Sequence, residues 1–246
     1  RLHQDLRRNQ GSGRCCQAAH PGLEIESCSS GGARVDYGVL SHTDRVWTSD
    51  SNDALDRLTI QRGCSFFLPN DVMGAHVGPR DCHITGRRVS IEMRCAVALF
   101  GHFGIEMDPR ELTDAEAQIL SQAIAFYKAE RSFMRSALLQ RLDSDGDSIN
   151  FGLVAPDQTR AIFTYNLVKE TGRTMPPRLR FAGLDPQAQY RLTLAWPSQL
   201  KEYSPSVLQV VPVAPVLPWG QINALAGQLA GEAVLWATRA ALRGDV

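Results

Sequence analysis

The chain has 246 residues, with 26 basic and 26 acidic side chains, so its formal net charge at neutral pH is zero. Hydrophobic residues make up 43% and charged residues 21%, a balance typical of a globular protein. This composition argues against a nucleic-acid partner. It also argues against a membrane partner, because no apolar run approaches the ~18 residues of a membrane-spanning helix. Nothing after Arg1 resembles a signal peptide, which predicts a cytoplasmic location.

The cysteines are irregularly spaced and include no CxxC motif; they are Cys15, Cys16, Cys28, Cys64, Cys82 and Cys95. In a chain of this length we expect reduced thiols rather than a disulfide framework. Adjacent ligands suit tetrahedral zinc poorly. The acidic run at residues 143–148 lacks the glycine and glutamate positions of an EF-hand loop, which favours a solvated turn. We therefore expect no metal site.

The first third of the chain alternates between strand and helix patterns. Residues 1–19 are rich in arginine and contain a GSG break, which predicts a poorly ordered lead-in. Residues 23–28 alternate like a strand and lead into a small-residue loop. Residues 45–49 form a second predicted strand, and an amphipathic helix follows over 54–63. Residues 64–69 are predicted to be a buried strand, followed by a loop over 70–78.

Two longer helices are predicted next. Apolar residues at three- and four-residue spacing favour a helix from about residue 88 to Phe103, ended by Gly104. A capping box from Thr113 to Glu116 then announces a helix that continues to about residue 134.

The second half of the chain changes to short alternating runs. Strands are predicted over 149–154, 160–168, 178–181, 189–195 and 206–213, separated by turn clusters, which indicates a small antiparallel β domain, a sandwich. The Ala- and Leu-rich segment 221–243 favours a helical tail. The predicted fold class is thus α/β, with a helix-and-strand unit over 20–135 and a β domain over 136–246.

The run WTSDSND, residues 47–53, places a cluster of carboxylates between a predicted strand and a helix. In α/β barrels, the loops from strand to helix build the active site. Asp50 is therefore the candidate for chemistry, although spacing alone favours a turn role for it. Asp53 directly precedes the helix and is predicted to be its N-cap.

Several sequence motifs, taken in chain order, resemble those of one enzyme family. The runs LEIESCSSGGARVD (residues 23–36), WTSDSNDA (47–54) and IQRG (60–63) resemble the C-terminal half of a glycoside hydrolase family 36 α-galactosidase. The runs MGAHV (73–77) and LFGHFG (99–104) fit the same family, as does the GLDP turn before Tyr190. The resemblance extends from about residue 20 to about residue 211.

The resemblance implies the last units of a (β/α)8 barrel over 20–135 and a C-terminal antiparallel β domain over 136–246. It implies a retaining hydrolase of terminal α-galactose, with melibiose- or raffinose-type substrates, no cofactor and a homo-oligomeric intact enzyme. Retaining glycosidases use two carboxylates about 5–5.5 Å apart. The family acid/base falls on Asp50. Cys28 and Gly31 match positions that line the galactose pocket, and Trp47 is the candidate for a pocket wall.

The chain also departs from the family pattern. It contains no Lys-Trp-Asp word, which carries the family nucleophile, and its three lysines are Lys128, Lys169 and Lys201. Residues 1–19 do not match the family. We therefore expect a fragment that carries the acid/base without the nucleophile and is inactive alone. The alternatives are a non-catalytic sugar-binding or assembly fragment, and an inactive remnant. Within the enzyme class, α-N-acetylgalactosaminidase and a raffinose synthase-like transferase stay open, although the loop at 28–32 favours galactose.

Overall fold

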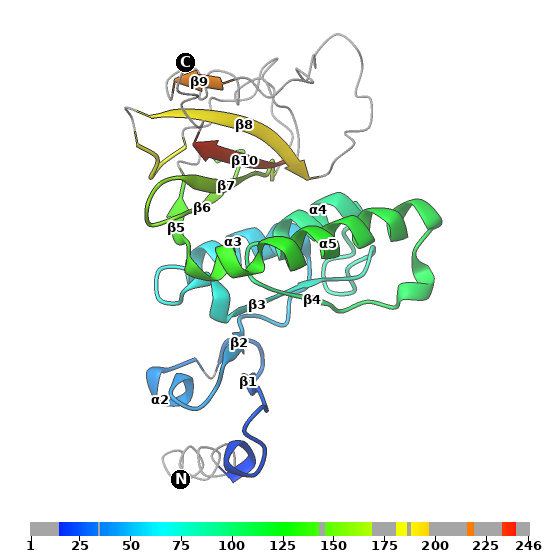
Figure 1. The fold of residues 1–246 in the computed structure, drawn as a ribbon. Helices are drawn as coiled ribbons and strands as arrows, with labels where there is room; N and C mark the ends of the chain where they lie inside the picture. Colours follow the sequence, from blue (N-terminus) through cyan, green and yellow to red (C-terminus); the bar gives the residue numbers. More distant parts are fainter. Residues whose placement is uncertain are drawn as a thin grey trace.

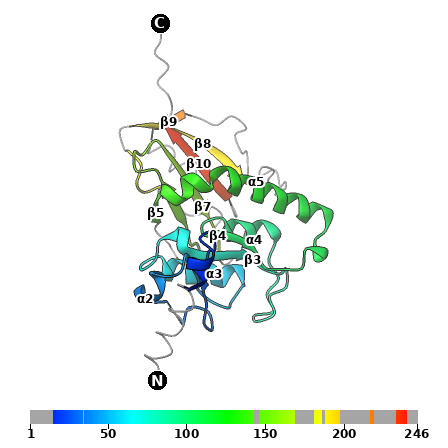
Figure 2. The ribbon, with the colours of Figure 1, turned by 60° about the horizontal axis from the view of Figure 1, so that its bottom comes forward.

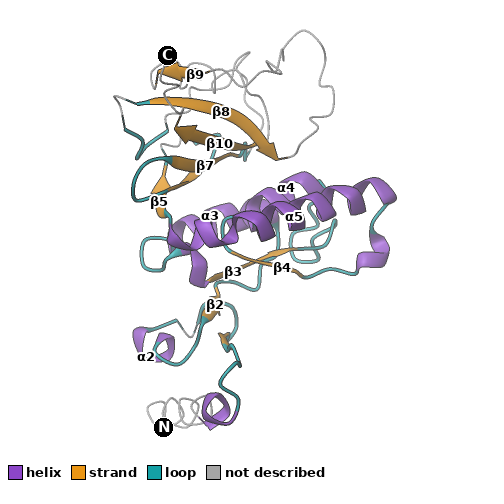
Figure 3. Ribbon diagram, viewed as in Figure 1, coloured by secondary structure: helices purple, strands orange, loops and turns teal. Residues whose placement is uncertain are grey.

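The structure is a computed structural model that describes residues 15–33, 35–142, 146–168, 181–185, 188–196, 216–218 and 233–239. It contains a four-stranded parallel sheet and a six-stranded antiparallel sheet. A layer of helices lies between the two sheets, as Figure 1 and the secondary-structure colouring of Figure 3 show. In Figure 2, turned by 60°, α4 and α5 again lie between β8 and β10 on one side and β3 and β4 on the other, whereas α3 overlaps the parallel strands.

The parallel sheet has the strand order β1-β2-β3-β4, which is also the order along the chain. Its strands are β1 (Glu26–Ser27), β2 (Arg45–Trp47), β3 (Met73–Val77) and β4 (His102–Ile105). All neighbouring pairs are parallel. Within the described ranges these strands form an open sheet with β1 and β4 at its edges. This arrangement agrees with the predicted partial barrel, because each strand is joined to the next by a helical connection.

The helices connect and cover these strands. A short helix, α2 (Tyr37–Leu40), joins β1 to β2, and α3 (Ala54–Cys64) joins β2 to β3. Helix α4 (Ile91–Ala98) joins β3 to β4, and the long α5 (Asp114–Ser136) leads to the antiparallel sheet. Each of the three longer helices begins with a side-chain cap, as expected for helix ends that would otherwise leave backbone N–H groups unpaired; the caps are Asp53, Ser90 and Thr113. The predicted capping box at Thr113 and Glu116 is confirmed.

The two faces of the parallel sheet differ in character. Ala75, Val77 and Phe103 lie on the helix side and belong to or pack against the main hydrophobic core. Side chains alternate along a strand, so Gly74, His76, His102 and Gly104 lie on the opposite face. In a (β/α)8 barrel the helices cover the outside of the sheet, so the predicted barrel would have this opposite face on its inside.

The antiparallel sheet has the order β5-β6-β7-β10-β8-β9. Its strands are β5 (Leu138–Arg141), β6 (Phe151–Val154), β7 (Arg160–Tyr165), β8 (Gln189–Trp196), β9 (Val216–Pro218) and β10 (Ala233–Arg239). All strands described for this part of the chain belong to one sheet, so the sandwich stays a prediction. The GLDP turn is tied down by Tyr190, whose hydroxyl donates to the Gln158 carbonyl at 2.8 Å and accepts from the Asp185 amide at 3.0 Å.

One hydrophobic core joins the helices to both sheets. Phe151 of β6 faces Phe100, which follows α4, with ring centroids 6.4 Å apart. The two parts are also linked by arginines at the ends of this layer. Arg62 of α3 donates to the Leu142 carbonyl at 3.2 Å, and Arg141 of β5 donates to the Ser65 carbonyl at 2.9 Å. Burial of this core is the main force that holds the β domain against the helices.

The prediction of a strand over 64–69 is wrong, and the loop predicted over 70–78 contains β3 instead. Helix α3 runs to Cys64, a turn follows, and Phe66 and Phe67 are exposed rather than buried. The short 3-10 helix Asn70–Val72 then leads into β3. The strand character of β3 is hard to read from sequence because its alternate residues are Gly74 and His76, which face the polar side of the sheet.

The helix predicted to reach Phe103 ends at Ala98. The chain turns at Gly101 and continues as β4. A Cβ at Gly101 would lie 2.6 Å from the Cβ of Ala75 and 2.7 Å from the Met73 carbonyl oxygen, so the turn packs directly on β3. Phe103 is apolar because it packs on α5, where the centroids of the Phe103 and Tyr127 rings are 5.2 Å apart. Its spacing from the apolar residues of α4 therefore resembled a continuing helix.

The prediction of a helical tail over 221–243 is also wrong where the structure describes it, because 233–239 is strand β10, paired with β7 and β8. The sequence also missed β5 and β9. Strands β6, β7 and β8 are confirmed, whereas the strand predicted over 206–213 lies outside the described residues. Residues 15–19 are helical. Among the described helices, none combines the length and hydropathy that a membrane crossing requires.

Candidate active site

The carboxyl ends of the parallel strands meet at one edge of the sheet, and the predicted site residues lie at this edge. Cys28 follows β1 directly, and Asp50 lies three residues after the end of β2. Gly31 belongs to the loop after β1. In barrel enzymes this edge carries the active site.

The loops after β1 and β2 are in direct backbone contact. Gly31 has a φ of +65°, and a Cβ there would lie 2.8 Å from the backbone N of Asp50 and 2.9 Å from the Cα of Ser49. A Cβ at Gly32 would lie 2.7 Å from the Thr48 carbonyl oxygen. No side chain fits at these positions without displacing backbone. The structure thus brings the backbones of Gly31 and Asp50 together, whereas a shared galactose pocket stays a prediction.

The backbone on both sides of Asp50 is held in place. The Ser51 amide donates to the Ser49 hydroxyl oxygen at 3.1 Å. The buried Cys82 thiol donates to Asn52 Oδ1 at 3.5 Å, and a Cβ at Gly78 would lie 2.7 Å from the Asn52 carbonyl oxygen. The Asp50 side chain is exposed and forms no hydrogen bond or ion pair with the residues that the structure describes. A fixed backbone with an accessible carboxyl group suits a residue that exchanges protons with a ligand.

Asp53 caps α3, which confirms the prediction from sequence. Its carboxylate accepts hydrogen bonds from the Leu55 and Asp56 amides and from Thr85, and it pairs with Arg87 at 2.6 Å. Burial alone would raise the pKa of this carboxyl group, but the hydrogen bonds from Thr85, Arg87 and the helix amides outweigh burial and lower the pKa. Asp53 is therefore a structural carboxylate that ties the loop around Thr85 to the start of α3.

Trp47 lies at the end of β2 and is covered by protein. The residue is only 7% exposed, and its ring stacks on the His76 ring, with centroids 4.3 Å apart. The guanidinium of Arg57 lies 4.4 Å from the centroid of the same ring. The Trp47 ring therefore supports the loop after β2, residues 48–53, which we call the Asp50 loop. The role of Trp47 as a pocket wall stays a prediction.

Arg57 of α3 is a residue of this site that the sequence analysis missed. It is 2% exposed and donates to the Ser49 carbonyl at 3.0 Å and the Gly74 carbonyl at 2.5 Å. Burial lowers the pKa of its guanidinium to about 10. The sequence offered one signal for Arg57: it lies on the stripe of α3 that is buried, between Ala54 and Gln61. A cation at a buried position needs hydrogen-bond partners or a counter-ion.

The face of the parallel sheet that points away from the helices carries a polar network, which the sequence analysis also missed. Arg45 of β2 pairs with Glu24 at 2.6 Å and Glu26 at 3.3 Å, and lies 3.3 Å from Nε2 of His102. The bond from Arg45 lowers the pKa of Glu24, whereas burial, followed by the charge of Arg45, lowers the pKa of His102.

His76 belongs to the same face. Its Nδ1 lies 3.3 Å from a carboxylate oxygen of Glu106, which follows β4. His76 thus joins the edge that carries the candidate site to the end of β4.

Within the described part of the chain, no group of three or more His, Cys, Asp or Glu side chains is arranged to hold a metal ion. The cysteines in this part are free thiols: Cys15, Cys16, Cys28, Cys64, Cys82 and Cys95. Cys28 is exposed beside the small-residue loop, where the resemblance places a pocket residue.

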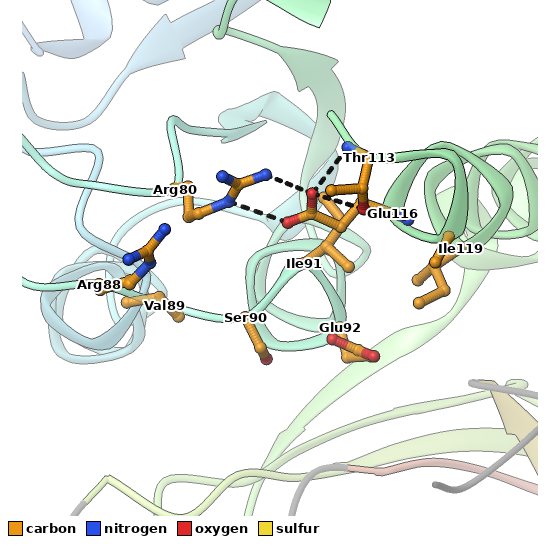
Figure 4. A pocket seen from close by; sticks show the side chains of 10 residues that line it. Arg80, Arg88, Val89, Ser90, Ile91, Glu92, Thr113, Glu116 and Ile119 are labelled. Atoms are coloured by element: carbon orange, nitrogen blue, oxygen red, sulfur yellow. Dashed lines mark hydrogen bonds and ion pairs between the residues drawn. The ribbon is translucent and has the colours of Figure 1, made fainter. Parts of the chain in front are cut away.

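A separate hollow of about 450 Å³ lies between the N-terminal ends of α4 and α5 (Figure 4). Arg80 bonds to Glu116 at one side of it, and Glu116 also accepts from Thr113. Burial lowers the pKa of Arg94, which is 3.5 Å from Glu116. None of the predicted site residues lines this hollow, so it is distinct from the edge that carries Asp50.

Comparison with known proteins identifies the family. The Melibiase family model matches residues 14–137, and the glycosyl hydrolase family 36 C-terminal domain matches residues 150–225. The chain therefore belongs to glycoside hydrolase family 36, a family of α-galactosidases.

Individual relatives agree with this assignment. The chain is 46% identical over 173 residues to an α-galactosidase of Escherichia coli, a match that covers 70% of this chain and 24% of that protein. It is 38% identical over 174 residues to α-galactosidase AgaA of Geobacillus stearothermophilus, again covering 70% and 24%. The chain thus spans about a quarter of the length of these curated relatives.

Solved structures of the family share the fold. AgaB of Geobacillus stearothermophilus superposes with a TM-score of 0.78 at 29% identity, over 93% of this chain and 30% of that one. A variant of AgaA in complex with raffinose superposes with a TM-score of 0.72 at 31% identity, over 91% and 30%. These relatives support a TIM-barrel-like domain followed by a C-terminal domain. The open parallel sheet is part of the barrel-like domain.

Proposed function

We propose that this chain supplies the acid/base carboxyl group of a retaining α-galactosidase, with Asp50 as the acid/base. The observation that carries the proposal is the contact between Gly31 and Asp50 at the carboxyl edge of the parallel sheet. The family match favours an enzyme over a non-catalytic binding fragment.

In the proposed first step, the Asp50 carboxyl group donates its proton to the glycosidic oxygen while the C1–O bond breaks. A second carboxylate forms a bond to C1 and holds the galactosyl group. In the second step, the Asp50 carboxylate accepts a proton from water, the water oxygen bonds to C1, and the bond to the nucleophile breaks. Both carboxyl groups end in their starting protonation states.

The nucleophile in this proposal comes from polypeptide that carries the earlier barrel strands, because this sequence has no Lys-Trp-Asp word. We therefore propose that the chain alone does not hydrolyse galactosides. Cys28 and Gly31 are proposed to line the galactose pocket, with Trp47 as a wall. We further propose a homo-oligomeric, cytoplasmic intact enzyme, in line with the family resemblance.

The proposed substrate class is terminal α-galactose on melibiose- or raffinose-type sugars. Structures of AgaA variants in complex with raffinose and with stachyose support this class. The glycine-rich loop after Cys28 also supports galactose, since its backbone lies directly against the Asp50 loop and leaves no room for added side chains there.

A chimera tests the proposal. The matched quarter of the E. coli α-galactosidase is replaced by this chain, and hydrolysis is measured with melibiose and with 4-nitrophenyl α-galactoside. We expect Asp50→Asn to lower turnover of melibiose by about 10²–10⁴-fold, the usual contribution of a general acid. The nitrophenyl substrate should lose less in the first step, because its leaving group needs no proton. Equal losses on both substrates would contradict the assignment of Asp50.

The chain by itself provides the second test. The full chain is purified, and circular dichroism is used to show that it is folded. We expect it to hydrolyse 4-nitrophenyl α-galactoside no faster than buffer alone does. Clear turnover that Asp50→Asn abolishes would mean that the nucleophile lies within this sequence.

A further inference from the structure

We propose that Arg57 is a positioning residue for the Asp50 loop, which it holds to strand β3 and to the Trp47 ring. This inference rests on the proposed acid/base role of Asp50. Arg57 acts through the backbone beside Asp50, so it is distinct from the residues that the resemblance assigns to the pocket.

The first argument is the pair of carbonyl groups that Arg57 contacts. Its Nη1 donates to the Ser49 carbonyl oxygen at 3.0 Å, and that carbonyl belongs to the peptide group that joins Ser49 to Asp50. Its Nη2 donates to the Gly74 carbonyl oxygen in β3 at 2.5 Å. One planar guanidinium therefore fixes the orientation of the peptide before Asp50 relative to the neighbouring strand.

The second argument is the ring stack at the end of β2. The Arg57 guanidinium lies 4.4 Å from the centroid of the Trp47 ring, close enough for a cation–π contact. Trp47 in turn stacks on His76 of β3, with centroids 4.3 Å apart. Strand β2 ends at Trp47, so the stack holds the exit of the strand from which the Asp50 loop begins.

The third argument is the cost of burying this side chain. Arg57 is 2% exposed, and burial lowers the pKa of its guanidinium to about 10. In the described part of the chain it forms no direct ion pair with a carboxylate. Its hydrogen bonds go to backbone carbonyls, and the charge of Glu106 offsets the effect of burial on its pKa only in part. A buried cation without a directly paired carboxylate is expensive, and an apolar side chain would pack at lower cost on this stripe of α3. The arginine is thus explained by what it holds.

The consequence concerns proton donation. A general acid must meet the glycosidic oxygen within hydrogen-bond reach, and a displacement of about 1 Å costs about 10²-fold in rate. Gly31 presses against the Asp50 amide from one side, and Arg57 holds the preceding carbonyl. Between them, the backbone of Asp50 has little freedom to move.

Hydrogen exchange of the full chain tests the positioning directly. Arg57→Met should make the amides of residues 49–51 exchange about tenfold faster, whereas Arg57→Lys, which can still reach one carbonyl, should give a smaller change. The matched control is Arg94→Met in α4. Arg94 is also 2% exposed and donates to the Gly78 and Val89 carbonyls at 2.8 and 3.1 Å. It differs from Arg57 in lying 3.5 Å from the Glu116 carboxylate, and its described hydrogen bonds do not include the Ser49 carbonyl.

Exchange in α5 reports global unfolding in each variant and normalises the comparison. If Arg94→Met accelerates residues 49–51 as much as Arg57→Met does, the effect is one of general stability and the proposal fails. If Arg57→Met unfolds the chain, Arg57→Lys carries the same test, and unchanged exchange at 49–51 would overturn the proposal.

A leaving-group series in the chimera tests the link to chemistry. We expect Arg57→Lys to lower turnover of melibiose about tenfold more than turnover of 4-nitrophenyl α-galactoside, because a displaced acid matters most for poor leaving groups. Equal losses on the two substrates would overturn the positioning role. Asp50→Asn, run in parallel, separates the two proposals: if it too gives equal losses, the acid/base assignment itself has failed, while the exchange data still decide whether Arg57 holds the loop.

Discussion

Gly31 and Asp50 lie in the loops after two neighbouring parallel strands, and a Cβ at Gly31 would lie 2.8 Å from the backbone N of Asp50. Contact this close ties the small-residue loop after Cys28 to the carboxylate loop after Trp47. Two motifs that are separate in the sequence thus form one surface at the carboxyl edge of the sheet.

Gly31→Ala is expected to damage the site more than the fold. The new methyl group would collide with the Asp50 amide, and alanine at a φ of +65° is strained by about 1–3 kcal/mol. We expect turnover of melibiose by the chimera to fall at least about tenfold, because the Asp50 loop must shift. Steady-state kinetics with melibiose measure this loss.

The control for this prediction is Gly63→Ala near the end of α3. A Cβ at Gly63 meets nothing within 4 Å, and alanine favours helix over glycine by about 0.5–1 kcal/mol. This variant should keep full turnover and unfold at a slightly higher temperature. If both glycine variants behaved alike, the contact with Asp50 would not explain the Gly31 result.

Asp53→Ala is expected to destabilise the chain by about 1–2 kcal/mol at neutral pH, the cost of losing a helix cap. The variant also leaves Arg87 without its closest carboxylate and Thr85 without an acceptor. Urea unfolding followed by circular dichroism measures the change. Asp56→Asn is the control, since Asp56 pairs with the same arginine at 3.2 Å but is 42% exposed; it should cost at most about 1 kcal/mol, as exposed pairs do.

The contribution of Asp53 should also depend on pH in a defined direction. Its pKa is lower in the folded chain than in the unfolded one, so its stabilisation is fully present above the unfolded value, about 3.9. That stabilisation is lost as the pH falls through the folded value. The gap in stability between the natural chain and Asp53→Asn should therefore shrink as the pH falls below about 4. A gap that stays constant down to pH 2 would contradict the lowered pKa.

The local features of this site were predictable because they depend on few neighbouring residues. The helix caps at Asp53 and Thr113 depend only on the residues that directly follow them, and both caps are confirmed. The contact of Gly31 and Gly32 with the Asp50 loop was not predicted, because it joins two loops that are separate in the sequence. The role proposed for Asp50 comes from the motifs that resemble the family, because spacing alone did not favour a catalytic role.

The features that were predicted wrongly or missed depend on contacts between segments that are distant in the sequence. Strand β3 was missed because Gly74 and His76 face the polar side of a sheet whose existence requires β2 and β4. The Ala- and Leu-rich run around Leu235 has helical propensity, but pairing with β7 and β8 makes it a strand. Arg57 was missed because its partners, Ser49 and Gly74, lie 8 and 17 residues away in sequence.

Glu116→Gln is expected to destabilise α5 at neutral pH by about 1 kcal/mol, because it removes a charge-assisted bond to Arg80. That bond lowers the pKa of Glu116 to about 2. A lowered pKa means that the stabilisation is present above the unfolded value and is lost as the pH falls toward 2. Thermal unfolding at pH 7 and pH 2.5 should therefore show a smaller difference at the lower pH. Asp114→Asn, an exposed change in the same helical turn, should show a much smaller difference at both.

Phe151→Ala tests how strongly the β domain depends on the helix layer. Phe151 is 4% exposed and faces Phe100 across the boundary between the two. Removing a buried aromatic side chain typically costs about 3–5 kcal/mol, and here the cavity would open at the boundary itself. We expect a loss of this size in urea unfolding of the full chain. Phe67→Ala is the matched control, because Phe67 is 75% exposed and its removal should change stability by less than about 0.5 kcal/mol. If Phe151→Ala cost no more than Phe67→Ala, the two sheets would be held together by the arginine contacts of Arg62 and Arg141 rather than by the shared core.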